Sequence, residues 1–178
     1  ERRYYQKITD IYAECSSDYD PKSEVTKTFY KTVQNMMHYA VSHQTAAEIV
    51  YNRANAEKPH MGLTTWKNAP DGRVVKSDVT IAKNYLSDKE IESLNLLTTA
   101  FLDMAEDRAR RHIIMKMTDW KTLLERYLQI SDRDILPDAG SVSHEEAEAK
   151  ALGEYEKFWR IQDKTILSDF DRFIEDLK

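Results

Sequence analysis

The side chains best suited to chemistry in this 178-residue sequence lie in one stretch, residues 58–76. Basic and aromatic residues are interleaved there with two prolines and two glycines. The seven candidate binding residues are Lys58, His60, Trp66, Lys67, Asp71, Arg73 and Lys76. Positive charge beside an aromatic ring is typical of sites for a phosphate, a nucleic-acid strand or an acidic partner. Long ordered connections between helices are also disproportionately functional.

The same stretch also fits a purely structural role. In that interpretation Trp66 plugs the core, His60 makes a hydrogen bond at a helix end, and the lysines face solvent. The two interpretations differ in one observable feature, the exposure of Trp66. A buried Trp66 favours the structural role, whereas an exposed Trp66 in a concave pocket with clustered polar groups favours a site.

Other catalytic chemistries find little support in the sequence. His38 and His43 are five residues apart, so they do not form the i, i+4 pair of a zincin helix, and they could meet Glu48 only if the helix broke near Ser42. Cys15 is the only cysteine, which excludes an internal disulfide and a cysteine-based zinc site. No phosphate-binding glycine motif occurs. We therefore predict no metal, no cofactor and no catalytic residues; the residues favour a non-enzymatic role and leave catalysis open.

Charge and hydropathy exclude further classes. The formal net charge is −5, so binding to nucleic acid through bulk charge is not expected. The densest basic cluster, "EDRARR" at 106–111, suits the end of a helix, and a DNA-contacting patch is the less favoured interpretation. No apolar run approaches the roughly 20 residues that span a bilayer. With one cysteine and no visible signal peptide, we predict a cytoplasmic protein without membrane contact.

The elements that position these residues are expected to be helices. Apolar residues recur at helical spacing, and three capping boxes start at Thr45, Ser87 and Ser143. Expected helices cover 1–15, 23–42, 45–55, 78–86, 87–111, 118–130 and 144–177. The scarcity of glycine and proline, four of each, argues against an all-β fold.

Two segments depart from a plain helical bundle. Residues 63–76 are expected to form a small β-hairpin or ordered loop, because "NAPDG" at 68–72 is strong turn chemistry between two short β-favouring runs. The last helix would carry an apolar stripe along its length. That stripe is Leu152, Tyr155, Trp159, Ile166, Phe170, Phe173 and Leu177. At about 50 Å, the helix would be longer than the globule is wide, which favours pairing with a second copy through 144–177.

Several motifs resemble one known family. They are "MHYA" at 37–40, "TAAEIVYNRA" at 45–54, "KPHMGLTTWKNAPDG" at 58–72, "KSDVTIAKNYL" at 76–86 and "MTDW" at 117–120. Together they resemble the RhuM family of bacterial virulence-associated proteins, up to about residue 165. The resemblance implies a protein whose biochemical role is unassigned and whose catalytic residues are not agreed, so none is carried over. It also implies an upstream segment similar to a helix-turn-helix DNA-binding module, which this chain lacks.

The sequence therefore predicts a mainly α-helical fold, with a single domain over 1–178 of six or seven helices, cut from a longer protein. The leading function is a non-enzymatic interaction or oligomerisation domain, with the long last helix for pairing and the loop 58–76 as its contact surface. Its possible partners are a second copy and, through the missing module, DNA. The alternative is a domain or enzyme that binds nucleic acid or a phosphorylated ligand, with His60, Lys67, Asp71 and Lys76 lining its site.

Overall fold

The computed structural model describes residues 10–13 and 16–165, and this part of the chain is mainly helical, as predicted. Its elements are α2 (Glu24–Ser42), α3 (Ala46–Arg53), the 3-10 helices η1 (Pro59–Gly62) and η2 (Ala82–Tyr85), α4 (Asp88–Arg110), α5 (Met117–Ile130) and α6 (His144–Thr165). The chain divides into two compact units, residues 1–46 with 88–140 and residues 47–87 with 141–178. The prediction of one domain stays a prediction.

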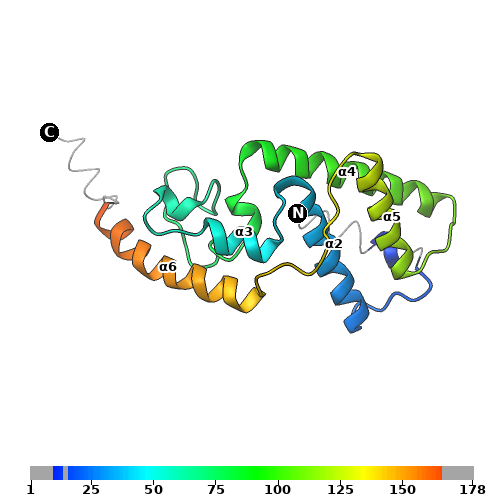
Figure 1. Ribbon diagram of the computed structural model, residues 1–178, viewed down its shortest axis with the longest axis horizontal. Coiled ribbons are helices and arrows are strands. Elements are labelled where there is room, and N and C mark those ends of the chain that lie inside the picture. Colours follow the sequence, from blue (N-terminus) through cyan, green and yellow to red (C-terminus); the bar gives the residue numbers. More distant parts are fainter. Residues whose placement is uncertain (1–9, 14–15, 166–178) are drawn as a thin grey trace. The chain divides into compact units, whose positions relative to one another are not determined.

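The first unit is built on α2, which contacts both α4 and α5 (Figure 1). Tyr12 and Trp120 are fully buried at its centre, and their ring centroids lie 4.9 Å apart. The Trp120 indole Nε1 donates a hydrogen bond to Ser16 Oγ at 2.9 Å, so the polar end of this buried ring has a partner. Of the stripe predicted for 1–15, Ile11 is buried in this core, whereas Tyr4, Ile8 and Cys15 lie outside the described residues.

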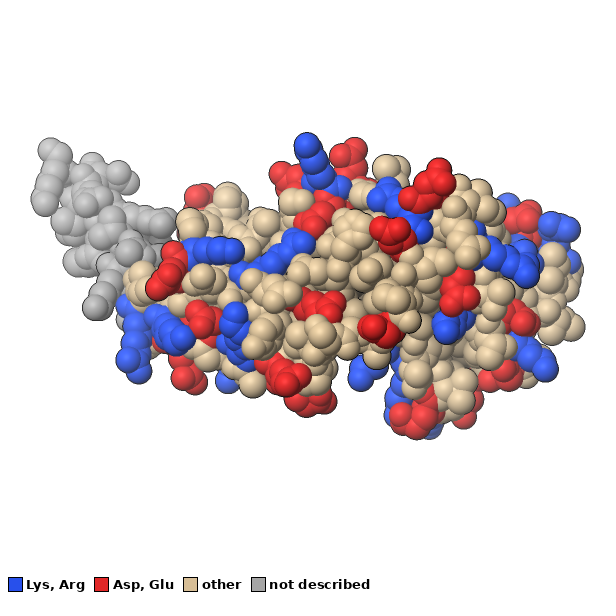
Figure 2. Space-filling model, viewed as in Figure 1, with Lys and Arg blue, Asp and Glu red and all other residues tan. Residues whose placement is uncertain are grey.

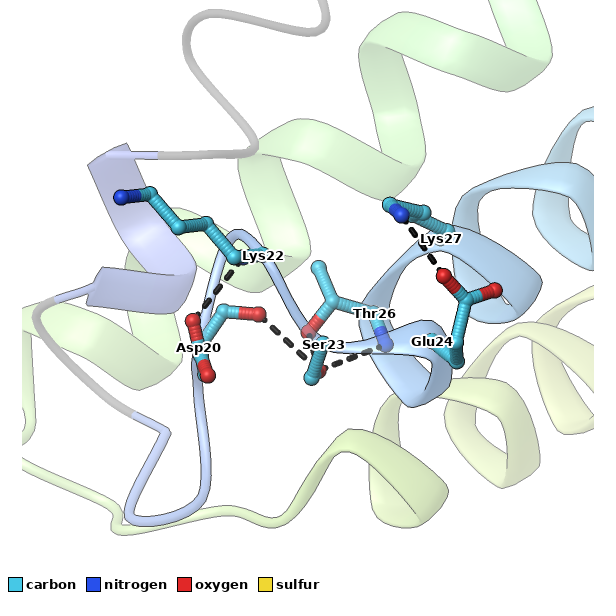
Figure 3. A network of polar contacts seen from close by, with 6 residues as sticks. All are labelled: Asp20, Lys22, Ser23, Glu24, Thr26 and Lys27. Carbon is cyan, nitrogen blue, oxygen red and sulfur yellow. Dashed lines mark hydrogen bonds and ion pairs between the residues drawn. The ribbon is translucent and has the colours of Figure 1, made fainter.

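Helix α2 begins with a local capping network (Figure 3). The backbone N–H of Thr26 donates to Ser23 Oγ at 3.2 Å, and the Ser23 hydroxyl donates to the Asp20 carbonyl at 3.0 Å. The Asp20 carboxylate accepts from Lys22 N at 2.9 Å. One N–H group of the first turn thus finds a side-chain partner at the N-cap, which favours the start of the helix at this point.

The second unit combines α3, the two 3-10 helices and α6. Helix α6 lies against η1. The buried apolar residues of this unit come from both of its chain segments. They are Ile49, Val50, Ala54, Ala56, Met61, Leu63, Trp66, Val74, Val79, Ala82, Tyr85, Leu86, Ala147, Ala151 and Phe158. The irregular segment 54–87 is therefore not a surface loop but contributes much of this core.

Two predictions for this segment are wrong. No strand occurs among the described residues, so the hairpin near 63–76 is not formed. Backbone groups that would pair across it bond elsewhere: Thr64 N donates to the Asn84 carbonyl, and Lys67 N to the Asp78 carboxylate. The α-helix expected over 78–86 is also absent, and only η2 forms there. Its four apolar positions are buried as the pattern indicates, but in turns.

Helix α6 begins as the sequence predicts. Ser143 N and Oγ both donate to the Glu146 carboxylate, and Glu146 N donates to Ser143 Oγ at 3.1 Å. The N–H of Ser143 lowers the pKa of the Glu146 carboxyl, with help from the Ser143 hydroxyl. The capping box is confirmed. The helix is described to Thr165, and Ile166, Phe170, Phe173 and Leu177 of the expected stripe lie outside the described residues.

The buried face of α6 differs from the predicted one. Ala147, Ala151, Phe158 and Gln162 face the core of the second unit, whereas Leu152 and Tyr155 are half-buried and Trp159 is 47% exposed. The stripe predicted from the hydrophobicity pattern consists of the larger apolar side chains. The packed face instead uses two alanines, which let the helix approach the irregular segment closely.

Candidate functional site in the loop 58–76 and helix α6

Trp66, the aromatic residue of the candidate site, is buried with 8% of its surface exposed. Its indole Nε1 donates to the Gly72 carbonyl at 2.8 Å. The His60 ring stacks on it, with centroids 4.3 Å apart and planes 24° from parallel. Both the ring face and the polar edge of Trp66 are therefore used within the loop, which is the arrangement expected of a structural plug.

The glycines of the loop also have structural reasons. Gly62 has a φ of +82°, and a Cβ added there would lie 2.5 Å from the Arg53 carbonyl oxygen. A Cβ added at Gly72 would lie 2.4 Å from the carbonyl oxygen of Asn68, to which Gly72 N donates at 2.7 Å. Backbone crowding requires glycine at both positions. The unusual composition of the loop therefore follows from its compact path.

Two buried polar side chains, Asp78 and Gln162, hold the loop. Asp78, which is 4% exposed, accepts from Lys67 N at 3.2 Å and from Val75 N at 2.9 Å. Gln162, on α6 and 6% exposed, accepts from Val74 N at 2.8 Å and donates from Nε2 to the Val74 carbonyl at 3.1 Å. Backbone groups of the loop thus form with side chains the hydrogen bonds that a neighbouring strand would otherwise have supplied.

Sequence reasoning missed both anchors. Neither Asp78 nor Gln162 is among the seven candidate binding residues. A signal existed for Gln162, because it stands four residues after the aromatic Phe158 on a helix and so shares its face. Pattern reading treats glutamine as a surface residue, and only the position of Val74 in space shows its role.

The charged members of the predicted site lie at the surface. Lys58, Lys67, Asp71, Arg73 and Lys76 are all exposed. Two of the seven predicted residues, His60 and Trp66, stack on each other. On the face shown in Figure 2, basic and acidic side chains are interspersed over the surface. The loop therefore offers scattered solvent-facing charges around a filled interior.

The other predicted cationic cluster, at 106–111, is paired with acids of its own helix. Arg110 lies 2.7 Å from Glu106, and Arg111 lies 3.4 Å from Asp107. Pairs four residues apart on α4 thus offset the positive charge near its end. This arrangement supports the helix-end interpretation over a DNA-contacting patch.

One hollow lies along α4, in the first unit. It measures about 390 Å³ and is lined on α4 by Asp88, Ile91, Glu92, Asn95, Leu96 and Thr99. None of the seven predicted residues lines it. The hollow brings two carboxylates beside an exposed leucine, without a histidine, cysteine or basic group to complete a catalytic set.

Helix α6 presents a different kind of surface on its outer side. Trp159 and Leu152 are seven residues apart and therefore lie on the same side of the helix. The exposed charges Glu156 and Arg160 lie beside them, one helical turn apart. A Cβ added at Gly153 would meet nothing within 4 Å. We call these residues, 152, 153, 156, 159 and 160, the outer face of α6.

The motifs of the loop lie in the part of the chain that one family model covers. The model, described as the Virulence protein RhuM family, matches residues 1–166. The chain belongs to the RhuM family. No curated protein and no solved structure gives a significant match to it. For this RhuM-family chain, family membership supplies no activity, so chemistry must be argued from the residues themselves.

Metal-ligand geometry is not seen in the described part of this RhuM-family chain. No group of three or more His, Cys, Asp or Glu side chains there could hold a metal ion. His38 is buried within α2, whereas His43 is exposed and its Nδ1 lies 3.2 Å from the Asp134 carboxylate. The arrangement of His38, His43 and Glu48 that a helix break would have allowed is therefore not formed: α2 does end at Ser42, but the two histidines point into different surroundings.

One more carboxylate ties α6 to its own unit. Glu154 accepts from Ala56 N at 2.8 Å and from Lys157 Nζ at 2.8 Å. The Ala56 N–H lowers the pKa of the Glu154 carboxyl, and the Lys157 hydrogen bond and charge act in the same direction.

In the described helices, no segment is long and apolar enough to cross a bilayer.

Proposed function

We propose that this RhuM-family chain is a non-enzymatic interaction and oligomerisation domain that associates through the outer face of α6. The observation that carries the proposal is the contrast between two tryptophans. Trp66 is buried and hydrogen-bonded inside its own loop, whereas Trp159 is 47% exposed on a helix. Exposed tryptophans on regular elements are enriched at protein interfaces.

The loop 58–76 supports the same conclusion, because its backbone groups and its aromatic ring already have partners within the chain. Its backbone bonds to Asp78, Gln162 and Asn84, and its aromatic ring is covered by His60. What remains for a ligand is a set of exposed charged side chains around this filled interior. A role accessory to an upstream DNA-binding module, as the family resemblance implies, fits a domain whose own surface offers a helix rather than a pocket.

Sedimentation velocity tests this proposal. The chain is run from 1 to 200 μM, alone and with a short DNA duplex at low salt. We expect concentration-dependent association that the duplex does not change. The paired variant Lys67→Ala with Lys76→Ala is the matched control, and it should associate as the wild type does.

A chain that stays monomeric over this range would contradict self-association. Binding to the duplex with a steep dependence on salt, lost in the paired lysine variant, would instead support the alternative function and return attention to the basic loop.

A further inference from the structure

The charges on the outer face of α6 are arranged so that they can pair with the same face of a second copy. Glu156 and Arg160 are both exposed, and neither has an ion-pair partner within the described residues. They are of opposite sign and one turn apart, on either side of the level of Trp159. A surface that carries both signs around an apolar centre can pair with a second copy of itself when the copy is rotated by a two-fold axis.

The relative direction of the two α6 helices decides whether opposite charges or like charges face each other. In a parallel pair each Glu156 lies level with the other Glu156, so like charges face each other. In an antiparallel pair whose two-fold axis passes near residue 158, Glu156 lies opposite Arg160 of the second copy, and Arg160 lies opposite its Glu156. The two Trp159 side chains then meet near the centre. Like charges in register are unfavourable, and reciprocal opposite charges are favourable.

Gly153 supports close approach on this face. Glycine inside a helix costs about 0.5–1 kcal/mol relative to alanine, and here a Cβ would meet nothing of the chain itself. No intramolecular contact therefore requires this glycine. A second helix packed against the outer face would come nearest the backbone at a position without a side chain.

We infer that two copies of this chain pair through α6 in antiparallel orientation, with Trp159 at the centre and reciprocal Glu156–Arg160 ion pairs beside it. This inference rests on the proposed function and adds to it the identity and direction of the partner. The occupant of the outer face is a second copy rather than a nucleic acid, because the face carries an exposed tryptophan and one charge of each sign, with no excess of basic residues.

Charge reversal tests the pairing. Glu156→Arg alone and Arg160→Glu alone should each raise the dimer dissociation constant by roughly tenfold, since each places like charges in contact twice per dimer. An equimolar mixture of the two variants should form a heterodimer with about wild-type affinity. The double variant E156R/R160E should also restore the homodimer, and Trp159→Ala should weaken it by roughly 30-fold.

Cross-linking tests the direction. In a Cys15→Ser background, Trp159→Cys should form an intermolecular disulfide on mild oxidation. Leu152→Cys should not, because it lies six residues from the two-fold axis, and 1.5 Å per residue on both copies separates the two positions by roughly 18 Å, whereas a disulfide needs Cα atoms within about 7 Å. Efficient cross-linking of Leu152→Cys would overturn the antiparallel arrangement.

The outcomes separate the two proposals. A wild-type chain that remains monomeric at 200 μM contradicts both. A wild-type dimer that is insensitive to both charge reversals, or whose variants do not recover when mixed, leaves oligomerisation standing and overturns the antiparallel pairing. Circular dichroism of each variant verifies that the fold is retained.

Discussion

Replacing Gln162 by leucine would remove both hydrogen bonds that this side chain makes to Val74 while keeping a similar volume. The Val74 carbonyl would keep only the long hydrogen bond from the Tyr155 hydroxyl, at 3.5 Å. Val74 is 1% exposed, so its N–H and C=O cannot turn to water without moving the loop. Each buried backbone group left without a partner costs about 1–3 kcal/mol. Burial of the leucine side chain offsets about 1–2 kcal/mol of that sum. We expect the free energy of unfolding to fall by about 2–3 kcal/mol.

Urea unfolding followed by circular dichroism measures this change, and amide hydrogen exchange at Val74 reports it locally. The matched control is Gln129→Leu, the same chemical change at an exposed position of α5, where we expect less than about 0.5 kcal/mol. The reasoning is refuted if Gln162→Leu unfolds at the wild-type urea concentration and the Val74 amide keeps its wild-type protection. Equal losses in both variants would point to helix propensity rather than to the lost amide bonds.

Three further changes test the interior of the second unit. Trp66→Ala should lower the free energy of unfolding by about 3–5 kcal/mol through lost burial, whereas Lys67→Ala should leave it unchanged in the same urea titration; equal stability of both variants would contradict the plug. Asp78→Asn should cost about 1.5–3 kcal/mol, because an amide offers one acceptor where the carboxylate accepts two N–H bonds, and Asp71→Asn, at an exposed site, is its control; a change no larger at Asp78 than at Asp71 would exclude the anchoring role. Glu154→Gln should destabilise the chain at pH 7 by about 1 kcal/mol and lose this effect in acid. The folded pKa of Glu154 lies below the ordinary 4.5, so the stabilisation is present above the unfolded pKa and disappears as pH falls through the folded one; a difference that persists unchanged at pH 2.5 would contradict it.

Local signals in the sequence were reliable where the interactions are local. The Ser143–Glu146 capping box and the burial of Phe29, Val33, Met36 and Ala40 on α2 follow from residues within a turn or two of each other, and both were predictable. Val25, which the same spacing places on that buried face, is instead 63% exposed. The mainly helical fold follows from the same periodicity. The burial of Val79 and Tyr85 was also predictable, since apolar spacing reports burial whatever the backbone does.

The rest depended on contacts between distant residues. The hairpin was predicted from good turn chemistry at 68–72, but Asp78 and Gln162 compete for the backbone groups that a hairpin would pair. The phase of α6 was misassigned because alanines rather than large side chains face the loop. Within the candidate site, residue types indicated a binding loop, and only the burial of Trp66 showed that its interior is filled.

The tie between Val74 and Gln162 also has a consequence during synthesis, because the two residues are 88 positions apart. At about 5–20 residues per second, a ribosome needs roughly 4–18 s to make that interval. Through that time the nascent loop has Trp66 and the apolar residues of 79–86 but not the helix that closes over them. Truncations that end before α6 should therefore aggregate or engage chaperones, and the last helix sets the moment at which the second unit becomes complete.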